Sequence, residues 1–275
     1  MPNPKILYGT AWKKATTATC VAAALRQGFR GIDTACQPRH YDEAGVGAGI
    51  AQCLDATLSR SDLYLQSKFT PLAGQDPARL PYDPQASLPE QIRQSCATSL
   101  HNLQTTYLDC LVLHSPLDNH TLTMTAWQAL QAAVTAGNVH RLGISNCYEL
   151  ATLQRLHRDA DIKPAVLQNR FYATTGYDRE LRAFCLEHGM VYQSFWTLTA
   201  NPQLLAHSAV RSAAQHYGRS AAQVLFRYLT QQGIVPLTGT TSTQHMKEDL
   251  EIFDFTLAPD ECTAIASALR PGVQA

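Results

Sequence analysis

The sequence predicts an α/β fold in which eight parallel strands alternate with helices and close into a (β/α)8 TIM barrel. Short apolar runs alternate with longer segments of helical spacing along the whole chain, and turn residues separate the two kinds of segment. Eight apolar runs occur, which is the number that closes such a barrel. The 275 residues match the roughly 250 of one barrel, so residues 1–275 are predicted to form a single domain.

The elements follow one another in a regular order. The predicted strands are residues 6–8, 31–32, 63–66, 108–113, 141–144, 165–167, 191–194 and 234–236. The predicted helices are residues 15–27, 43–54, 88–102, 125–136, 148–157, 179–188, 220–232, 243–252 and 258–269. Several helices are followed by a residue that can take the left-handed conformation which ends a helix, namely Gly28, Gly137, Gly189 and Gly233.

Composition narrows the classes of function. Lys plus Arg equals Asp plus Glu at 22 each, so no basic excess attracts nucleic acid or an anionic membrane. No run approaches the roughly 20 apolar residues of a spanning helix, and no charged leader precedes an apolar stretch, so a soluble, cytoplasmic protein is expected. Nothing demands an oligomer, and a monomer is expected. The eight cysteines are scattered without metal-ligand spacing, which predicts reduced, mostly buried thiols and no metal site.

Four polar residues stand at or just beyond the ends of apolar runs. Asp33 and Tyr41 follow the second predicted strand, Lys68 follows the third and His114 follows the fourth. Barrel enzymes build their sites at the carboxyl ends of their strands, so this placement predicts an active site. The irregular stretch 70–89, with five prolines, follows the Lys68 strand and is expected to shape a substrate pocket.

Ordered sequence segments then point to a family. They are GTAWK (9–13), GFRGIDTA (28–35), LYLQSKF (63–69), LDCLVLHSP (108–116), VHRLGISN (139–146), PAVLQNRFY (164–172) and HMKEDLEIFDF (245–255). By these segments the chain resembles the aldo-keto reductases over nearly its whole length. The resemblance implies a barrel that binds a nicotinamide cofactor without a Rossmann fold and reduces aldehydes or ketones. The alternative is a nucleotide-binding barrel that acts as a sensor or regulatory subunit with little turnover.

The chemistry of the polar residues agrees with carbonyl reduction. Hydride delivery to a carbonyl carbon leaves an alkoxide that needs a proton from a nearby acid. A tyrosine can be that acid if a neighbouring ammonium lowers its pKa, with a buried Asp holding the ammonium. Lys68 and Asp33 are expected to fill these roles, and His114 to orient the carbonyl oxygen.

Each of these assignments has a structural alternative. Lys68 could be a strand-end lysine that reaches solvent. Asp33 could cap a local turn. His114 could be a core histidine satisfied by the backbone. The match of these residues to the family segments favours the catalytic reading of all three.

The tyrosine is ambiguous, because the sequence departs from the family pattern there. DTACQPRHYDEAGVG carries two more residues than the usual segment. Counting back from Val46 and Gly47 puts His40 in the tyrosine position, whereas residue type favours Tyr41. Tyr41 is the predicted proton donor because only a phenol suits a lysine-assisted acid, and His40 is then expected at the substrate mouth.

The resemblance also assigns the nicotinamide end of the cofactor site. Ser145, Asn146 and Gln168 match residues that hydrogen-bond the carboxamide, and Phe195 matches an aromatic that stacks on the ring. Without the family, Phe195 would be interpreted as barrel core. Further cofactor contacts are expected from Gly9, Thr10, Asp33, Trp196 and Leu198.

The adenosine end departs from the family pattern. The segment PLTGTTSTQHMKEDL lacks the usual lysine and arginine that hold a 2'-phosphate. His245 stands in the arginine position, and Lys247 could compensate. The remaining expected contacts are Gly239, Thr240, Thr241, Ser242, Glu248 and Asp249, beside a helix N-terminus suited to phosphate. Because charge-assisted bonds are roughly twice as strong as neutral ones, we expect NADPH to be preferred only modestly, with NADH possible.

The substrate side is expected to be open. Trp12, His40, Tyr82 and His114 are the predicted substrate-binding residues, with packing as the alternative role of Trp12. The chain lacks the N-terminal hairpin and the long C-terminal tail that larger relatives carry, so broad specificity with modest affinity is expected.

Overall fold

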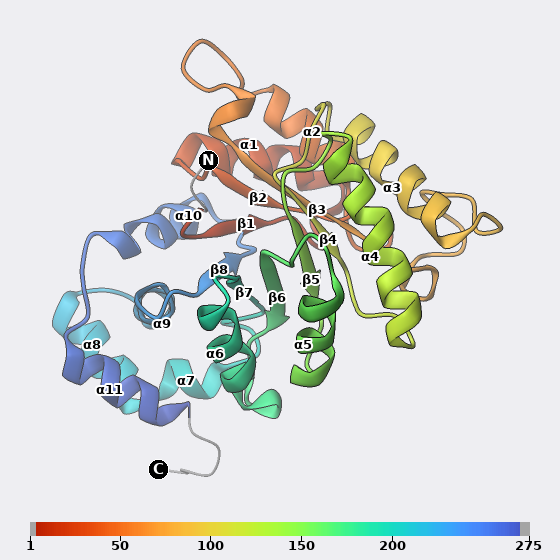
Figure 1. The fold of residues 1–275 in the computed structure, drawn as a ribbon. Helices are drawn as coiled ribbons and strands as arrows, with labels where there is room; N and C mark the ends of the chain where they lie inside the picture. Colours follow the sequence, from red (N-terminus) through yellow and green to blue (C-terminus); the bar gives the residue numbers. More distant parts are fainter. Residues whose placement is uncertain (1–3, 270–275) are drawn as a thin grey trace.

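The eight strands of the computed structural model, which describes residues 4–269, form one closed parallel barrel. Neighbours in sequence are neighbours in the barrel, and β8 pairs with β1 to close it (Figure 1). The strands are β1 (Leu7–Gly9), β2 (Gly31–Asp33), β3 (Tyr64–Phe69), β4 (Cys110–Leu113), β5 (Leu142–Ser145), β6 (Val166–Arg170), β7 (Val191–Phe195) and β8 (Val235–Thr238). The predicted (β/α)8 barrel is confirmed.

Helices surround the strands (Figure 1). They are α1 (Thr17–Gln27), α2 (Glu43–Ala51), α3 (Leu88–Asn102), α4 (His120–Thr135), α5 (Leu150–Asp159), α6 (Arg179–Glu187), α7 (Pro202–Ala206), α8 (Ser208–Tyr217), α9 (Ala221–Gln231), α10 (Thr243–Leu250) and α11 (Pro259–Ala268). Each predicted helix is present, with shifts of a few residues at its ends. The prediction missed α7 and α8, since Pro202 starts only a short helix and His207 interrupts the apolar pattern between the two.

Several strands run further toward their carboxyl ends than predicted. Strand β3 ends at Phe69 and therefore contains Lys68, which the sequence placed after the strand. Strand β6 was expected to end at residue 167 but continues to Arg170, which pairs with Phe195 of β7. These extensions carry polar side chains upward along the inner wall of the barrel.

The barrel interior is layered. At the bottom, a small apolar cluster of Leu7, Tyr64, Cys110, Val112, Val166 and Val235 fills the lumen. Because side chains alternate between the two faces of a strand, the residues two positions further along face the lumen one layer higher. From Tyr64 and Val166, that step leads to Gln66 and Gln168, so an amide layer lies directly above the apolar one.

The large core lies between strands and helices, and it includes most of the cysteines. All eight cysteines are free, and six are buried, as predicted. The four glycines predicted to end helices, Gly28, Gly137, Gly189 and Gly233, all have positive φ. Within residues 4–269, none of the helices combines the length and the apolarity needed to traverse a lipid bilayer.

Helix α2 packs closely on the end of α3 through Gly47. A Cβ atom added at Gly47 would lie 3.0 Å from the Cα atom of Leu103, and the backbone there cannot move aside cheaply. Overpacking of this kind costs about 1–3 kcal/mol. We therefore expect Gly47→Ala to lower the melting temperature by roughly 2–4 °C for each kcal/mol lost, measured by circular dichroism. Ala44→Ser, at an exposed position of the same helix, is the control, and equal melting temperatures for both variants would contradict the close contact.

Candidate active site

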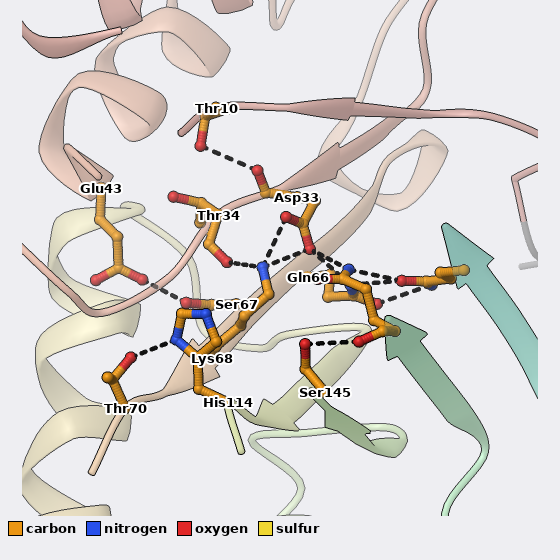
Figure 2. Close-up of polar contacts among 12 residues, drawn as sticks. Thr10, Asp33, Thr34, Glu43, Gln66, Ser67, Lys68, Thr70, His114 and Ser145 are labelled. Carbon is orange, nitrogen blue, oxygen red and sulfur yellow. Dashed lines mark hydrogen bonds and ion pairs between the residues drawn. The ribbon is translucent and has the colours of Figure 1, made fainter. Parts of the chain in front are cut away.

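A buried ion pair lies at the carboxyl ends of β2 and β3 (Figure 2). The Lys68 Nζ atom lies 2.7 Å from Asp33 Oδ1 and 2.6 Å from Oδ2, and both side chains are almost fully buried. Lys68 Nζ also donates to the Thr34 carbonyl oxygen at 2.8 Å. The three protons of the ammonium thus have acceptors, and the alternative of a lysine reaching solvent is wrong.

Amide side chains complete the surroundings of Asp33. Its Oδ1 atom accepts hydrogen bonds from Gln66 Nε2 at 2.7 Å and from Gln168 Nε2 at 2.9 Å. Gln193 joins the two amides, because its Oε1 accepts from both Gln66 and Gln168. Tyr64 closes the layer from below by donating to Gln66 Oε1. Asp33 therefore serves as the hub of a network that crosses the lumen, not as a local turn cap.

The β2–α2 connection, where the sequence departs from the family pattern, contains a tight turn. The backbone N–H groups of His40 and Tyr41 both donate to the Gln37 carbonyl oxygen, at 3.1 Å and 3.0 Å. This turn directs the Tyr41 ring toward the ion pair: Lys68 Nζ lies 5.3 Å from the ring centroid. The Tyr41 and His114 rings meet edge to face at 6.2 Å. Tyr41, and not His40, therefore lies beside Lys68 and His114.

His40 turns toward the other side of the loop. Its ring lies 3.8 Å from the Trp12 ring, and its carbonyl oxygen accepts from the Trp12 backbone N–H at 2.7 Å. Burial and the nearby charge of Arg39 lower the pKa of His40. His40 and the exposed Trp12 both line the cavity described below, so this pair forms one wall of its mouth.

Electrostatics at Tyr41 differ from the sequence-based expectation. Burial raises the pKa of Tyr41, and the charge of Asp33 raises it further. The sequence-based expectation was a lowered pKa, but the net shift is upward, because burial and the Asp33 charge dominate it. Tyr41 therefore stays protonated at neutral pH.

His114 is held by Thr70 at the end of β3 (Figure 2). The Thr70 Oγ1 atom lies 2.6 Å from His114 Nδ1, which leaves Nε2 for a ligand. Burial, followed by the charges of Lys68 and His40, lowers the pKa of His114 to about 3, so the ring is neutral at physiological pH. The Thr70 hydroxyl can donate to or accept from Nδ1, and when it donates, the proton of the neutral ring lies on Nε2.

The prediction that Tyr82 and the 70–89 stretch shape the pocket is wrong. No residue of that stretch lines the cavity. Tyr82 is buried against Phe69, and its hydroxyl donates to the Thr70 carbonyl oxygen at 2.9 Å. Gln75 donates to the same oxygen at 3.1 Å. Through Tyr82 and Gln75 this stretch binds the backbone of Thr70, so it acts behind the site by fixing the residue that contacts His114.

Asp33 of the ion pair and the two rings line one end of a cavity of about 930 Å³. This volume is near the upper end of the range of about 300–1,000 Å³ for ligand pockets. The predicted site residues that line it are Gly9, Trp12, Asp33, His40, Tyr41, His114, Ser145, Asn146, Gln168, Phe195, Trp196, Leu198, Gly239, Thr240, His245, Glu248 and Asp249. Phe195, whose alternative was barrel core, thus faces the cavity.

Some predicted cofactor contacts lie outside the cavity lining. Thr10 is buried, and its hydroxyl donates to the Asp33 carbonyl oxygen, tying β1 to β2. Ser242 caps α10 by accepting from the His245 backbone N–H, and Thr241 is exposed in the preceding turn. Lys247 also lies outside the lining, and its Nζ atom is 3.7 Å from a Glu251 carboxylate oxygen.

The far end of the cavity is acidic. Asp249 is buried, accepts from the Thr238 hydroxyl at 2.6 Å, and has its pKa raised by burial to about 6. Glu248 and His245 lie beside it in the lining, which includes no lysine at this end. Ser220 and Ala222, at the N-terminus of α9, also line this end.

Several residues of the site were not predicted from the sequence. Thr70 had no motif to mark it, and Gln66 and Gln193 looked like ordinary strand residues. Arg170 also lines the cavity but was placed beyond the predicted end of β6. The alternation of residues 166, 168 and 170 could have identified it, because residues two apart on a strand share a face.

Comparisons with known proteins agree with this geometry. The family model described as "Aldo/keto reductase family" matches residues 5–270. The uncharacterized oxidoreductase YtbE of Bacillus subtilis is 32% identical over 246 residues, covering 89% of this chain and 81% of YtbE. The glyoxal reductase of the same organism is 30% identical over 246 residues, covering 89% and 80%. A crystal structure of an aldo/keto reductase from Brucella melitensis superposes with a TM-score of 0.80 at 27% identity, covering 96% of this chain and 94% of that one.

We expect the Thr70 hydroxyl to donate to Nδ1 and thereby to favour the His114 tautomer that is protonated at Nε2. Thr70→Val keeps the side-chain shape but removes the partner of Nδ1, which leaves a buried polar atom unsatisfied at a cost of about 1–3 kcal/mol. We expect a lower free energy of unfolding in urea and a changed ring-nitrogen chemical shift for His114 by NMR. Thr70→Ser retains the hydroxyl and is the control. If the valine and serine variants had the same shift and stability, Thr70 would not set the tautomer.

Proposed function

The chain belongs to the aldo/keto reductase family, and we propose that it is an NAD(P)H-dependent oxidoreductase that reduces aldehydes or ketones to alcohols. One observation carries the proposal. Tyr41 and His114, with Lys68 behind them, lie together at a cavity of about 930 Å³. The oxidoreductase names of the relatives support the same class of reaction.

Tyr41 is the proposed proton donor to the developing alkoxide. Its raised pKa keeps the phenol protonated until a stronger base forms beside it. Lys68, 5.3 Å from the ring centroid, would stabilise the phenolate left behind, and Asp33 holds the ammonium in position. The burial of the ion pair excludes water from this step and keeps the distances fixed.

His114 is the proposed orienting residue. Its neutral ring, with Nδ1 committed to Thr70, can donate from Nε2 to a carbonyl oxygen that also faces Tyr41. The two donors then meet at one oxygen atom. Trp12 and His40 would bound the substrate on the outer side, where the mouth is open.

The cavity residues fit a nicotinamide dinucleotide, which would supply the hydride. Gln168 Nε2 donates to Asp33 and Gln193 inside the barrel. The side-chain oxygen of Gln168 would therefore be available to accept from the carboxamide N–H of the cofactor. Asn146 sits at positive φ with its amide anchored to the His114 carbonyl oxygen, and Phe195 offers a ring face. At the other end, the N-terminus of α9 suits phosphate oxygens.

We propose that NADPH is preferred only modestly and that NADH is also used. His245 replaces an arginine, and Glu248 and Asp249 place carboxylates at the adenosine end. A 2'-phosphate would find no lysine or arginine among the residues lining that end, which limits the discrimination between the cofactors.

The first experiment tests the reaction and the cofactor together. Purified protein is assayed for NADPH and NADH oxidation with a nitro-activated benzaldehyde, methylglyoxal and a diketone, alongside cofactor titration by fluorescence quenching. Turnover supports the reductase. Tight binding without turnover would instead support a sensor or regulatory subunit, and no binding would contradict both.

Tyr41→Phe is expected to reduce kcat for aldehyde reduction by about 10²–10⁴-fold, because a general acid contributes that much. The cofactor dissociation constant should change little, as the hydroxyl lies on the substrate side. His40→Phe is the matched control, since it keeps a ring against Trp12, and it should retain most of the activity. A large loss of kcat in His40→Phe alone would mean that His40 is the acid.

His245→Arg is expected to tighten NADPH binding by about tenfold while leaving NADH binding nearly unchanged, because it adds a charge-assisted donor for the 2'-phosphate. Dissociation constants from fluorescence titration give the ratio. Gln215→Arg, at an exposed position of α8, controls for the added net charge. If both variants shifted the ratio equally, His245 would not adjoin the 2'-position.

A further inference from the structure

One arginine at the top of the barrel lumen has no charged partner. Arg170 is the last residue of β6 and lines the cavity. Its Nε atom is buried without a hydrogen-bond partner. Within residues 4–269, no side chain or carbonyl group forms an ion pair or hydrogen bond with its guanidinium. By contrast, Arg60 contacts Asp109 at 2.8 Å and Arg219 contacts Glu251 at 2.9 Å.

Aromatic rings hold this guanidinium in place without neutralising it. The Arg170 Cζ atom lies 4.2 Å from the Trp196 ring centroid and 5.3 Å from that of Tyr172. Trp196 adopts a positive φ of 55°, which is uncommon for a bulky residue and costs conformational energy. Both rings lie within cation–π range of the guanidinium, and neither supplies a hydrogen-bond acceptor in its plane for the N–H groups that bind oxyanions.

The backbone around Arg170 is also fixed. Its N–H donates to the Tyr148 hydroxyl at 3.2 Å, and Tyr148 in turn donates to Asn146 Oδ1 at 3.3 Å. The strand register pairs Arg170 with Phe195 and places it one inward-facing step above Gln168. The guanidinium is therefore preorganised on the β6 wall of the cavity, above the amide layer.

We propose that Arg170 binds an oxyanion, the carboxylate or phosphate group of a ligand in this cavity. A partly buried charge without a partner is costly unless a ligand supplies the counter-charge. Asp33, the nearest carboxylate of the amide layer, is already bound by Lys68. The proposal rests on the proposed function and deepens it.

The position of Arg170 admits two sources of the oxyanion. His114 faces the lumen one step above Val112, as Arg170 does above Gln168, so both reach the mouth of the barrel. A carbonyl compound held at His114 and Tyr41 could extend a carboxylate toward the β6 wall. Alternatively, the diphosphate of the dinucleotide could pass along the same wall beside Trp196. The recognition chemistry is the same, because arginine binds both groups bidentately.

The test compares wild type with Arg170→Met, which keeps much of the apolar stem but removes the charge. Two quantities are measured: the dissociation constant of NADPH, and KM for 4-carboxybenzaldehyde against its neutral methyl ester. Arg179→Met, an exposed arginine at the start of α6, is the matched control for the lost charge. Arg170→Lys, which retains charge without the planar fork, should show a partial effect.

If Arg170 binds a substrate carboxylate, KM for the acid should rise by about tenfold or more in Arg170→Met. KM for the ester and the cofactor dissociation constant should stay within about twofold. If Arg170 binds the cofactor diphosphate, the NADPH dissociation constant should rise by about tenfold or more, and KM for the acid and for the ester should change equally. Changes below twofold in all of these quantities, with the methionine variant folded by circular dichroism, would overturn the proposal.

A failure of the proposed function is distinguishable from a failure of this inference. If wild type turned over no aldehyde, the reductase proposal would fail. Isothermal titration of inorganic pyrophosphate and benzoate into wild type and Arg170→Met would still test the arginine. Equal binding of both anions to the two proteins, or binding to neither, would overturn the oxyanion site.

Discussion

The buried Lys68–Asp33 ion pair is the constraint around which the upper half of the barrel is organised. Two charges removed from water are tolerable only when their remaining hydrogen-bonding capacity is satisfied. The Thr34 carbonyl oxygen takes the third ammonium proton, and the amides of Gln66 and Gln168 complete Asp33 Oδ1. Removing one partner of such a pair typically costs about 3–5 kcal/mol, because an uncompensated charge remains. The amide layer above the apolar cluster thus supplies the hydrogen bonds that make the buried ion pair tolerable.

The same constraint explains why an altered loop is compatible with an intact site. The β2–α2 connection carries two additional residues, yet its turn on Gln37 brings a ring to Lys68. The loop ends at α2, whose Glu43 is buried against Ser67 and Ser99. Elsewhere in this loop, the His40 ring lies 3.8 Å from the Trp12 ring at an interplanar angle of 36°.

The barrel was predictable because its signals are local and repeated. Eight apolar runs, helical spacing and terminal glycines each identify an element without knowledge of its neighbours. Asp33, Lys68 and His114 could be predicted for a related reason, since strand ends of a parallel barrel converge. Residue type favoured Tyr41 over His40, but residue spacing could not decide between them, because the direction of adjacent loop side chains depends on the turn that the loop adopts.

Other parts of the site depend on contacts distant in sequence. Thr70 lies next to His114 only because β3 and β4 are paired, and Tyr82 fixes Thr70 from behind rather than lining the pocket. Arg170 became visible once β6 proved longer than its apolar run. The polar residues at strand ends weaken the apolar signal where function begins, so strand boundaries are hardest to predict at the site.

The ion pair influences the charge state of its two neighbouring rings, whereas the other end of the cavity is governed by different groups. Its two charges act on different neighbours: Asp33 contributes to the raised pKa of Tyr41, and Lys68 contributes to the lowered pKa of His114. Both effects add to burial and favour uncharged forms, so the two rings carry no charge at neutral pH. The far end differs, because the pKa of Asp249 is raised only to about 6 and its carboxylate titrates near the physiological range. Tyr41 and His114 therefore keep the same protonation state across the pH range in which Asp249, at the other end of the cavity, gains or loses its proton.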